Sequence, residues 1–160
     1  MGPPTVDELV ARIALYPDDL LGIILPASTN PLQVVEAQRF LDQRKSNTSL
    51  KPKSSWDDSV EAMLNYPEVL AMMSRDLDWT TALGEAVVAD QAEVMDAVQS
   101  FRRKVKSAGN LKSDDKLRVS EAENVIVIQQ ADPQVIYVPT YQPSTVIVSQ
   151  PYPVYSYGPP

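Results

Sequence analysis

The chain has 160 residues, 44% of them hydrophobic and 22% charged, and its 14 Lys and Arg against 21 Asp and Glu give a formal net charge of −7. The absence of Cys and His excludes disulfides, thiol catalysis, His-based triads and ordinary zinc sites within this chain. The acidic balance argues against nucleic acid as a partner, and no apolar run reaches the roughly 18–20 residues of a transmembrane segment. We expect a single domain over residues 5–149 with a hydrophobic core, followed by an extended or disordered Pro/Tyr-rich tail over residues 150–160.

Short helices separated by prolines are predicted at the start of the chain. The motif at residues 5–8 (TVDE) is a capping box that begins the first helix. The Tyr-Pro pair at residues 16–17 ends that helix, because proline disfavours the α conformation at the residue before it. The same proline opens a second helix, which is predicted to end at Leu25 before the next proline. Asn30-Pro31 repeats this arrangement at the start of a third helix.

A second pair of predicted helices repeats the Tyr-Pro junction 50 residues further along the chain. Ser55 or Asp57 caps a helix that stops at Tyr66-Pro67, and Pro67 opens the next helix. The match to residues 16–17 indicates two related helix–Tyr-Pro–helix units. They arise either by internal duplication or by convergence of helical hairpins.

The longest predicted helix covers residues 79–107, with Asp78 as its N-cap and Gly109 as a left-handed residue just after its end. Apolar side chains recur along it at alternating intervals of four and three, a heptad-like stripe in which Gln91 is polar. Such a stripe is either the core-facing side of one long helix or a seam for a helix from another chain. We expect the core-facing side, with Phe101 buried.

The periodicity changes to that of β-strands near the C-terminus. β-branched runs at residues 124–129 and 134–138 flank a turn at residues 131–133 and predict a hairpin, and a third short strand is predicted at residues 145–148. The edge of this sheet is either blunted by neighbouring prolines or open to a strand from a partner. The predicted fold class is α+β and predominantly helical. It comprises five to six helices with one long spine helix, and a small C-terminal antiparallel hairpin or three-stranded sheet.

Basic residues gather at the end of the long predicted helix. Residues 101–118 hold seven basic and two acidic side chains, although the chain as a whole is acidic. The cluster comprises Arg102, Arg103, Lys104 and Lys106. It is either a solvated helix end whose cations offset the helix dipole, or a contact for anionic lipid headgroups, lipopolysaccharide or an acidic partner.

Six aromatic residues at helix starts, Tyr-Pro junctions and the predicted hairpin are further candidate binding residues. They are Tyr16, Trp56, Tyr66, Trp79, Tyr137 and Tyr141. Core packing explains aromatic residues at such positions. A cluster of flat rings at the surface would instead form a platform for a peptide or a glycan.

Catalysis without His or Cys would require paired carboxylates, a Ser–Lys dyad or a metal held by carboxylates. The acidic pairs at residues 18–19 and 57–58 fall in first turns of predicted helices, where the helix dipole alone favours acids. Ser113 and Lys116 match the S-x-x-K pattern, but the motifs that accompany it in Ser–Lys enzymes are missing. We therefore expect no catalytic residues, no metal site and no cofactor.

Six stretches of the chain resemble one bacterial family. They are residues 15–21 (LYPDDLL), 27–37 (ASTNPLQVVEA), 69–73 (VLAMM), 77–80 (LDWT), 108–111 (AGNL) and 131–143 (ADPQVIYVPTYQP). Together they extend over about residues 9–148 and are similar to the Gram-negative envelope family called domain of unknown function 3300.

This resemblance implies a location but no chemistry. Members of that family typically carry an export signal or lipoprotein leader and a long Tyr/Pro/Gly-rich C-terminal region. It therefore implies a periplasmic or outer-membrane-associated bacterial protein whose natural chain extends beyond both ends of this one. The family brings no established activity, so no catalytic residue is transferred from it.

We expect a non-catalytic interaction or structural module of the cell envelope, whose partner is a protein or a cell-wall or outer-membrane component. The alternative is a carboxylate-dependent periplasmic enzyme, for example a glycan-acting hydrolase. The sequence does not indicate the oligomeric state of the protein.

Overall fold

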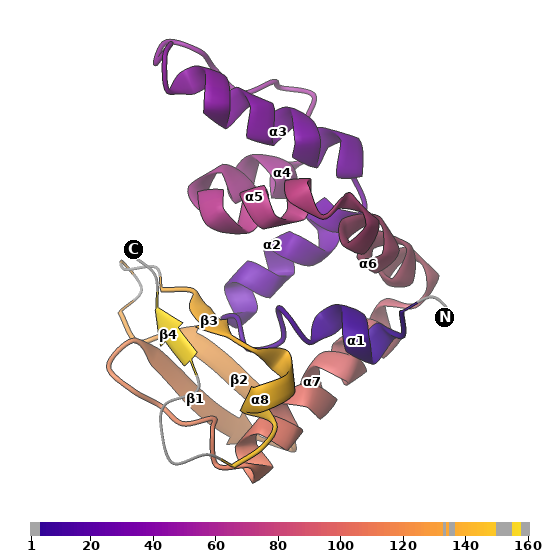
Figure 1. The fold of residues 1–160 in the computed structure, drawn as a ribbon, viewed down its shortest axis with the longest axis vertical. Helices are drawn as coiled ribbons and strands as arrows, with labels where there is room; N and C mark the ends of the chain where they lie inside the picture. The colour runs from indigo at the N-terminus through magenta and orange to yellow at the C-terminus, as the bar shows by residue number, and fades with distance from the viewer. Residues whose placement is uncertain (1–3, 133, 135–136, 150–154, 158–160) are drawn as a thin grey trace. The chain divides into compact units, whose positions relative to one another are not determined.

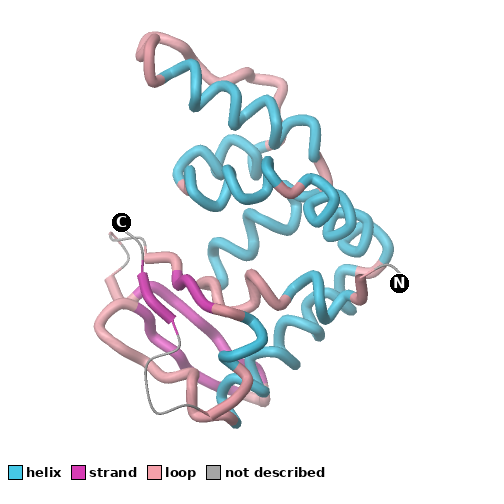
Figure 2. Tube along the Cα trace, in the orientation of Figure 1, coloured by secondary structure: helices cyan, strands magenta, loops and turns pink. Residues whose placement is uncertain are grey.

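The computed structural model describes residues 4–132, 134, 137–149 and 155–157. The chain forms two compact units, which are described separately. The first unit combines Met1–Leu21 with Ala92–Pro160, and the second is the intervening Gly22–Gln91. In the described residues the strands are confined to the first unit, whereas the second is built of helices and loops (Figure 2). No helix in this described part of the chain is both long and apolar enough to cross a membrane.

Short helices make up the second unit (Figure 1). They are the C-terminal part of α2 (Asp18–Ser28), α3 (Pro31–Arg44), α4 (Asp58–Ala62), the 3₁₀ turn η1 (Met63–Asn65), α5 (Pro67–Arg75) and α6 (Leu77–Ala89). α3 contacts α4, α5 and α6, and buried residues of these helices form a core. In this core, the ring of Trp56 meets that of Phe40 edge to face at 5.8 Å between centroids.

Both predicted Tyr-Pro junctions are helix breaks, as expected. α1 (Val6–Val10) ends before Tyr16, and α2 begins directly after Pro17, whose carbonyl accepts the amides of Leu20 and Leu21. α5 begins at Pro67 itself. Because proline lacks an amide hydrogen, it is tolerated in the first turn of a helix but not in the middle of one continuous helix.

The second helix does not end at Leu25, because α2 continues through Pro26 to Ser28. Pro26 lies close to the end of the helix, and the amide it lacks would have bonded to the carbonyl of Gly22, which is exposed. Water can satisfy that carbonyl, so the helix tolerates the proline. The next turn crosses α6 closely: a Cβ atom added to Gly84 would lie 2.1 Å from the Ser28 carbonyl oxygen, so only glycine fits there.

The predicted spine helix is wrong as a single element. The structure has α6 (Leu77–Ala89) and α7 (Gln91–Ser107), separated by Asp90 in an extended conformation with φ −164° and ψ 93°. Asp is a weak helix former, and the apolar stripe lacks full burial at this point, since Val87 is half-buried and Gln91 is exposed. Helix α6 is also capped earlier than predicted, by the Asp76 side chain, which accepts the Trp79 amide at 3.2 Å.

The core-facing role of the stripe holds for α7. Val94, Val98 and Val105 have no exposed surface, and Phe101 is 8% exposed. The helix ends at Ser107 as predicted, and Gly109 just after it has a φ of +81°. This left-handed residue allows the Asn110 amide to bond back to the Val105 carbonyl, the pattern of a Schellman cap.

The hairpin of the first unit differs from the predicted one. β2 (Val125–Gln130) lies where a strand was expected, but it pairs antiparallel with β1 (Leu117–Ala122). Glu123 and Asn124 form the turn, both with positive φ, as tight hairpins require. β1 escaped prediction because LRVSEA is mostly polar and only Leu117 of it is buried.

The predicted three-stranded sheet is also wrong. The described residues form two separate two-stranded sheets, β1–β2 and β3–β4, with β3 at Pro139–Tyr141 and β4 at Tyr155–Tyr157. The first two residues of the third strand expected at 145–148 instead lie in α8 (Pro143–Val146), because Pro143 suits a first helical position and the Gln142 carbonyl accepts the Val146 amide. Of the strand expected at residues 134–138, residues 135 and 136 lie outside the described residues. The fold class is α+β and predominantly helical, as predicted.

Side chains occupy the outer edges of the β1–β2 hairpin. The side chain of Gln99 accepts a hydrogen bond from the backbone N–H of Ile126 at 2.8 Å and donates one to the Ile126 carbonyl at 2.9 Å. On the other strand the Ser113 hydroxyl accepts the Val119 amide at 2.8 Å and donates to the Val119 carbonyl at 3.1 Å. A strand from a partner would have to displace these bonds, so the hypothesis of an open docking edge at residues 125–128 is wrong.

Candidate functional site

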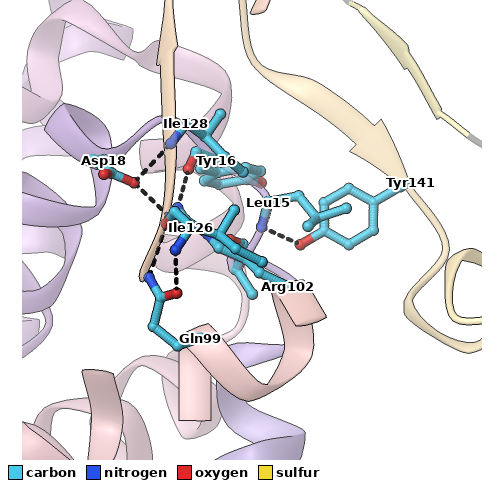
Figure 3. A network of polar contacts seen from close by, with 9 residues as sticks. Leu15, Tyr16, Asp18, Gln99, Arg102, Ile126, Ile128 and Tyr141 are labelled. Carbon is cyan, nitrogen blue, oxygen red and sulfur yellow. Dashed lines mark hydrogen bonds and ion pairs between the residues drawn. The ribbon is translucent and has the colours of Figure 1, made fainter. Parts of the chain in front are cut away.

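Arg102, predicted as part of a basic surface cluster, is 1% exposed and lies inside the first unit (Figure 3). Its guanidinium donates to three backbone carbonyls: Nε to Ala14 at 2.7 Å, Nη1 to Ile126 at 2.8 Å and Nη2 to Tyr16 at 2.9 Å. Nη1 also lies 2.7 Å from Asp18 Oδ1. Burial lowers the pKa of Arg102, and the Asp18 carboxylate opposes that shift.

Tyr141 holds the same N-terminal segment from another side. Its hydroxyl donates to the Ala11 carbonyl at 2.6 Å and accepts the Leu15 amide at 3.2 Å, while its ring lies 6.4 Å from that of Phe101. We call Arg102 and Tyr141 the backbone clasp, since together they fix residues 11–16. Tyr16, whose carbonyl Arg102 holds, is half-buried, and burial raises the pKa of its own hydroxyl.

Stability at alkaline pH should depend on Tyr141. Burial raises the pKa of its hydroxyl above the value of about 10 in the unfolded chain, so its contribution is complete below pH 10 and declines as the pH rises beyond it. Tyr141→Phe removes both hydrogen bonds and should lower the free energy of unfolding by about 1–3 kcal/mol at pH 7. The variant should then lose less stability than the wild type between pH 9 and 11, measured by urea unfolding.

The control for this prediction is Tyr137→Phe, which leaves the contacts to Ala11 and Leu15 in place. It should follow the wild-type pH profile above pH 9. An identical alkaline decline in the wild type and Tyr141→Phe would show that the buried hydroxyl does not contribute to it.

The remaining members of the predicted basic cluster have different surroundings. Lys106 forms an ion pair with Glu121 on β1. Arg103 and Lys104 are exposed, and the Arg103 guanidinium donates to the Asn124 carbonyl at 3.4 Å. These two cations line a shallow depression of about 510 Å³ that is wide open to solvent, which we call the basic hollow; its other lining residues are Ser100, Ser107, Ala108, Ile147 and Ser149.

The local sequence explains how the basic hollow forms. The last two turns of α7 supply the cations and two of the serines, at the end of the helix where positive charge is stabilising. Asn110 follows the helix cap, and its side-chain amide donates to the carbonyls of Val146 at 2.7 Å and Val148 at 2.8 Å. These bonds fix the segment that carries Ile147 beside the helix end.

The chemistry of the basic hollow suits anionic oxygens. A guanidinium presents a planar fork of donors, an ammonium adds a compact positive charge, and serine hydroxyls donate further hydrogen bonds. Ile147 is 39% exposed and adds an apolar surface beside the charges. A carboxylate or phosphate attached to a larger, partly apolar molecule fits this combination.

A second hollow beside it is lined by carboxylates, including Asp7, Glu93 and Asp96, together with Arg103. Asp7 and Glu93 occupy helix first turns, where the dipole favours acids, and all three carboxylates are exposed. Within the part of the chain that the structure describes, no group of three or more acidic side chains is arranged to hold a metal ion.

Three of the predicted aromatic residues lie in the second unit. Trp56 and Trp79 are 5% and 6% exposed, and the Trp56 ring nitrogen donates to Glu36 Oε1 at 3.2 Å. Tyr66 is half-buried and precedes α5. Hydrogen bonds from Lys53 and from Trp56 lower the pKa of Glu36. The two tryptophans are packed in the helical core rather than exposed on a surface.

Tyr137 belongs to a group that sequence reasoning missed. Its ring meets that of Tyr157 edge to face at 6.0 Å, and the Lys116 ammonium lies 5.6 Å and 5.4 Å from the centroids of the two rings. The Tyr157 hydroxyl donates to Asp114 Oδ2 at 2.6 Å. The signal present in the sequence was the Tyr-rich tail itself, but its pairing with residues 114–116 is long-range.

Comparisons with known proteins agree with the resemblance seen in the sequence. The chain matches the family model described as "Protein of unknown function (DUF3300)" over residues 3–159. It is 30% identical to the Escherichia coli (strain K12) protein named "Uncharacterized protein YacH" over an alignment of 178 positions, gaps included. The match covers 88% of this chain but 29% of that relative, so the chain spans less than a third of the relative's length. No solved structure matches. The chain therefore belongs to the DUF3300 family of proteins of unknown function.

Proposed function

We propose that the protein is a non-catalytic interaction module of the bacterial cell envelope, which binds an anionic envelope component through the basic hollow. The observation that carries this proposal is the division of the basic cluster. Arg102 is buried and hydrogen-bonded within the fold, and Lys106 is paired with Glu121. Arg103 and Lys104, in contrast, are exposed together in a hollow with three serines. The periplasmic or outer-membrane location rests on the resemblance of residues 9–148 to an envelope family.

Local charge supports an anionic ligand. Residues 101–118 carry a net charge of +5 within a chain of net charge −7, so positive charge is concentrated around the end of α7. Two classes of envelope component present the required oxygens: cell-wall polymer through the carboxylates of its peptides, and lipopolysaccharide through its phosphates. Their shared chemistry is an exposed anionic group on a large molecule.

A non-catalytic role is supported by the state of the polar groups that an enzyme could have used. The hydroxyl of Ser113, the nucleophile position of the S-x-x-K match, is bonded to both backbone groups of Val119. The buried Arg102 and the half-buried Tyr141 are bonded to backbone. The carboxylates of the second hollow are exposed, whereas a carboxyl group that acts as a general acid is one whose pKa is raised by burial.

Co-sedimentation of the full chain with purified peptidoglycan sacculi, and separately with lipopolysaccharide, tests the proposal. The wild type should bind one of the two, more weakly as the salt concentration rises. The double variant Arg103→Glu/Lys104→Glu should bind at least about tenfold more weakly, a loss of about 1.4 kcal/mol. The matched control is Lys45→Glu/Lys51→Glu, which makes the same charge change on exposed positions of the second unit and should bind like the wild type.

The two arms identify the source of the anion, because binding to sacculi indicates carboxylates and binding to lipopolysaccharide indicates phosphates. Absence of binding to both, or equal binding by the wild type and the Arg103/Lys104 variant, would contradict the proposed site. Release of soluble glycan fragments from sacculi would contradict the non-catalytic role.

A further inference from the structure

The sheet formed by β3 and β4 joins the domain to its own tail. β4 (Tyr155–Tyr157) pairs antiparallel with β3 (Pro139–Tyr141), in the register Pro139–Tyr157, Thr140–Ser156 and Tyr141–Tyr155 (Figure 1). The added strand comes from the Tyr/Pro-rich end of the chain. The domain thus already binds an extended tyrosine-containing segment by strand addition.

In addition to the backbone pairing of β4, side chains of the first unit contact the side chain of Tyr157. Its hydroxyl donates to Asp114, its ring packs against Tyr137, and the Lys116 ammonium lies over both rings. These three residues, with β3, are here called the tyrosine cradle. They come from segments before β1 and before β3, so the cradle is made without the segment that links β3 to β4.

The tyrosine cradle is held by the rest of the first unit. The Asp114 carboxylate accepts the amides of Lys116 and Leu117, each at 2.8 Å. The side chain of Gln130 bonds to the backbone amide and carbonyl of Tyr137 at 3.1 and 3.0 Å. β3 is anchored by the buried hydroxyl of Tyr141. A receptor fixed in this way loses little conformational entropy when it binds a strand.

The charge of Asp114 contributes to this recognition. Burial alone would raise the pKa of Asp114, but hydrogen bonds from Tyr157, Leu117 and Lys116 together outweigh it, so the pKa is lowered. Asp114 therefore presents a carboxylate to the Tyr157 hydroxyl at neutral pH. A hydrogen bond from a hydroxyl to a charged acceptor is stronger than one between neutral groups.

The connection to β4 is short. Asn110 holds the carbonyls of Val146 and Val148, so the chain is fixed to the domain up to residue 148. Six residues, 149–154, separate that point from β4. The contact that docks the tail is a ladder of three residue pairs. Release of such a short strand breaks few bonds, and every one of them can form again with an identical strand from another molecule.

We propose that two copies of this chain exchange their β4 strands, so that Tyr155–Tyr157 of each copy occupies the tyrosine cradle of the other. A second copy is favoured as the partner because the segment seen in the cradle is the chain's own, and exchange of identical elements preserves every contact. The residues between the anchored Val148 and β4 act as the tether in both arrangements. The tyrosine cradle shares no residue with the lining of the basic hollow, although Ser149 of the connecting residues lies in that lining, so variants of the cradle and of Arg103 and Lys104 test the two proposals separately.

Cysteine trapping tests the exchange directly, since the chain has no Cys of its own. Thr140 and Ser156 are exposed and lie opposite each other. Opposite residues of antiparallel strands have Cα atoms about 4.5–5.5 Å apart, which a disulfide can span. Full-length Thr140→Cys and Ser156→Cys chains are mixed in equal amounts in a glutathione redox buffer, and the disulfide-linked dimers are counted by mass spectrometry.

If the strands exchange, disulfide-linked dimers that contain one chain of each kind should exceed the half of all dimers that random pairing gives. Their amount should also increase with protein concentration. Adding Tyr157→Ala to the Ser156→Cys chain should reduce the excess by about tenfold, because the hydroxyl and ring contacts are lost. Replacing Ser156→Cys by Ser149→Cys, an exposed position that is not opposite Thr140, should give the random share. Mixed dimers at the random share and insensitive to Tyr157→Ala would overturn the proposal.

A chain carrying both substitutions, Thr140→Cys and Ser156→Cys, checks the pairing itself. At low protein concentration it should form a disulfide within one molecule, because the two positions are partners in the register. Failure to form this disulfide at any concentration would show that β4 does not occupy β3 in solution, which would also overturn the exchange.

Discussion

Replacing Arg102 with methionine should lower the free energy of unfolding by about 2–6 kcal/mol, because two backbone carbonyls are left without their donor at about 1–3 kcal/mol each. Methionine fills a similar volume but donates no hydrogen bond, so the carbonyls of Ala14 and Tyr16 lose their charged donor. The Ile126 carbonyl keeps the bond from Gln99. Asp18 is 40% exposed and can be hydrated, so most of the loss should come from the buried carbonyls.

Urea unfolding followed by far-ultraviolet circular dichroism measures the free energy of unfolding. Amide hydrogen exchange at Ile126 and Ile128 measures the loss of stability in the first unit. Arg102→Lys should fall between the wild type and Arg102→Met, because an ammonium keeps the charge but cannot reach the separate carbonyls with a planar fork. Arg103→Met is the matched control on the same helix and should change stability by less than about 1 kcal/mol. Equal stability of Arg102→Met and the control would contradict the buried role.

Truncating Phe101 to alanine should cost about 3–5 kcal/mol, the range for a large aromatic side chain removed from a core. Phe101 is 8% exposed, and its neighbour on the same stripe, Val98, has no exposed surface. The ring also packs 6.4 Å from the ring of Tyr141, so its loss removes support from one half of the backbone clasp.

The same urea measurement applies to Phe101→Ala. Met95→Ala, on the same helix but 38% exposed, is its control and should cost less than about 1 kcal/mol. An unchanged unfolding midpoint for Phe101→Ala would mean that the stripe on α7 does not face a core within this chain. A stripe that serves as a seam between chains would then show a midpoint that depends on protein concentration.

Local rules predicted the helix boundaries that depend on a few neighbouring residues. The Tyr-Pro junctions, a cap at Ser55 or Asp57 and the left-handed Gly109 each depend on backbone chemistry within one turn. The structure has the junctions and Gly109, and its cap is Asp57. The break at Asp90 was missed because a heptad-like stripe runs across it. Periodicity describes which faces are apolar, but it does not show whether successive turns share one core.

The strand predictions failed for the opposite reason. β2 is β-branched and was found, but its partner β1 is polar and is stabilised by Ser113 and by pairing with β2. Pairing is a long-range property, and β propensity depends strongly on such context. Pro143 began α8 rather than bordering a strand, although the β-branched residues after it favoured the extended form.

The candidate site shows the same limit. Sequence alone located four basic residues at one helix end, yet it could not distinguish the buried Arg102 from its exposed neighbour Arg103. The difference arises from carbonyls 86 and 88 residues away in the chain, those of Tyr16 and Ala14. The basic hollow likewise depends on Asn110, which fixes a segment 36 residues further along.

Amide chemical shifts of the full chain, recorded during titration with inorganic phosphate and with a soluble peptidoglycan fragment, test the basic hollow as the binding surface. We expect saturable shift changes with at least one of these ligands. The changes should centre on Ser100, Arg103, Lys104 and Ser107, and the Arg103→Glu/Lys104→Glu variant should lose them. Saturable changes confined to residues 22–91, or no saturable change with either ligand, would contradict the assignment of the basic hollow as the site through which this protein binds.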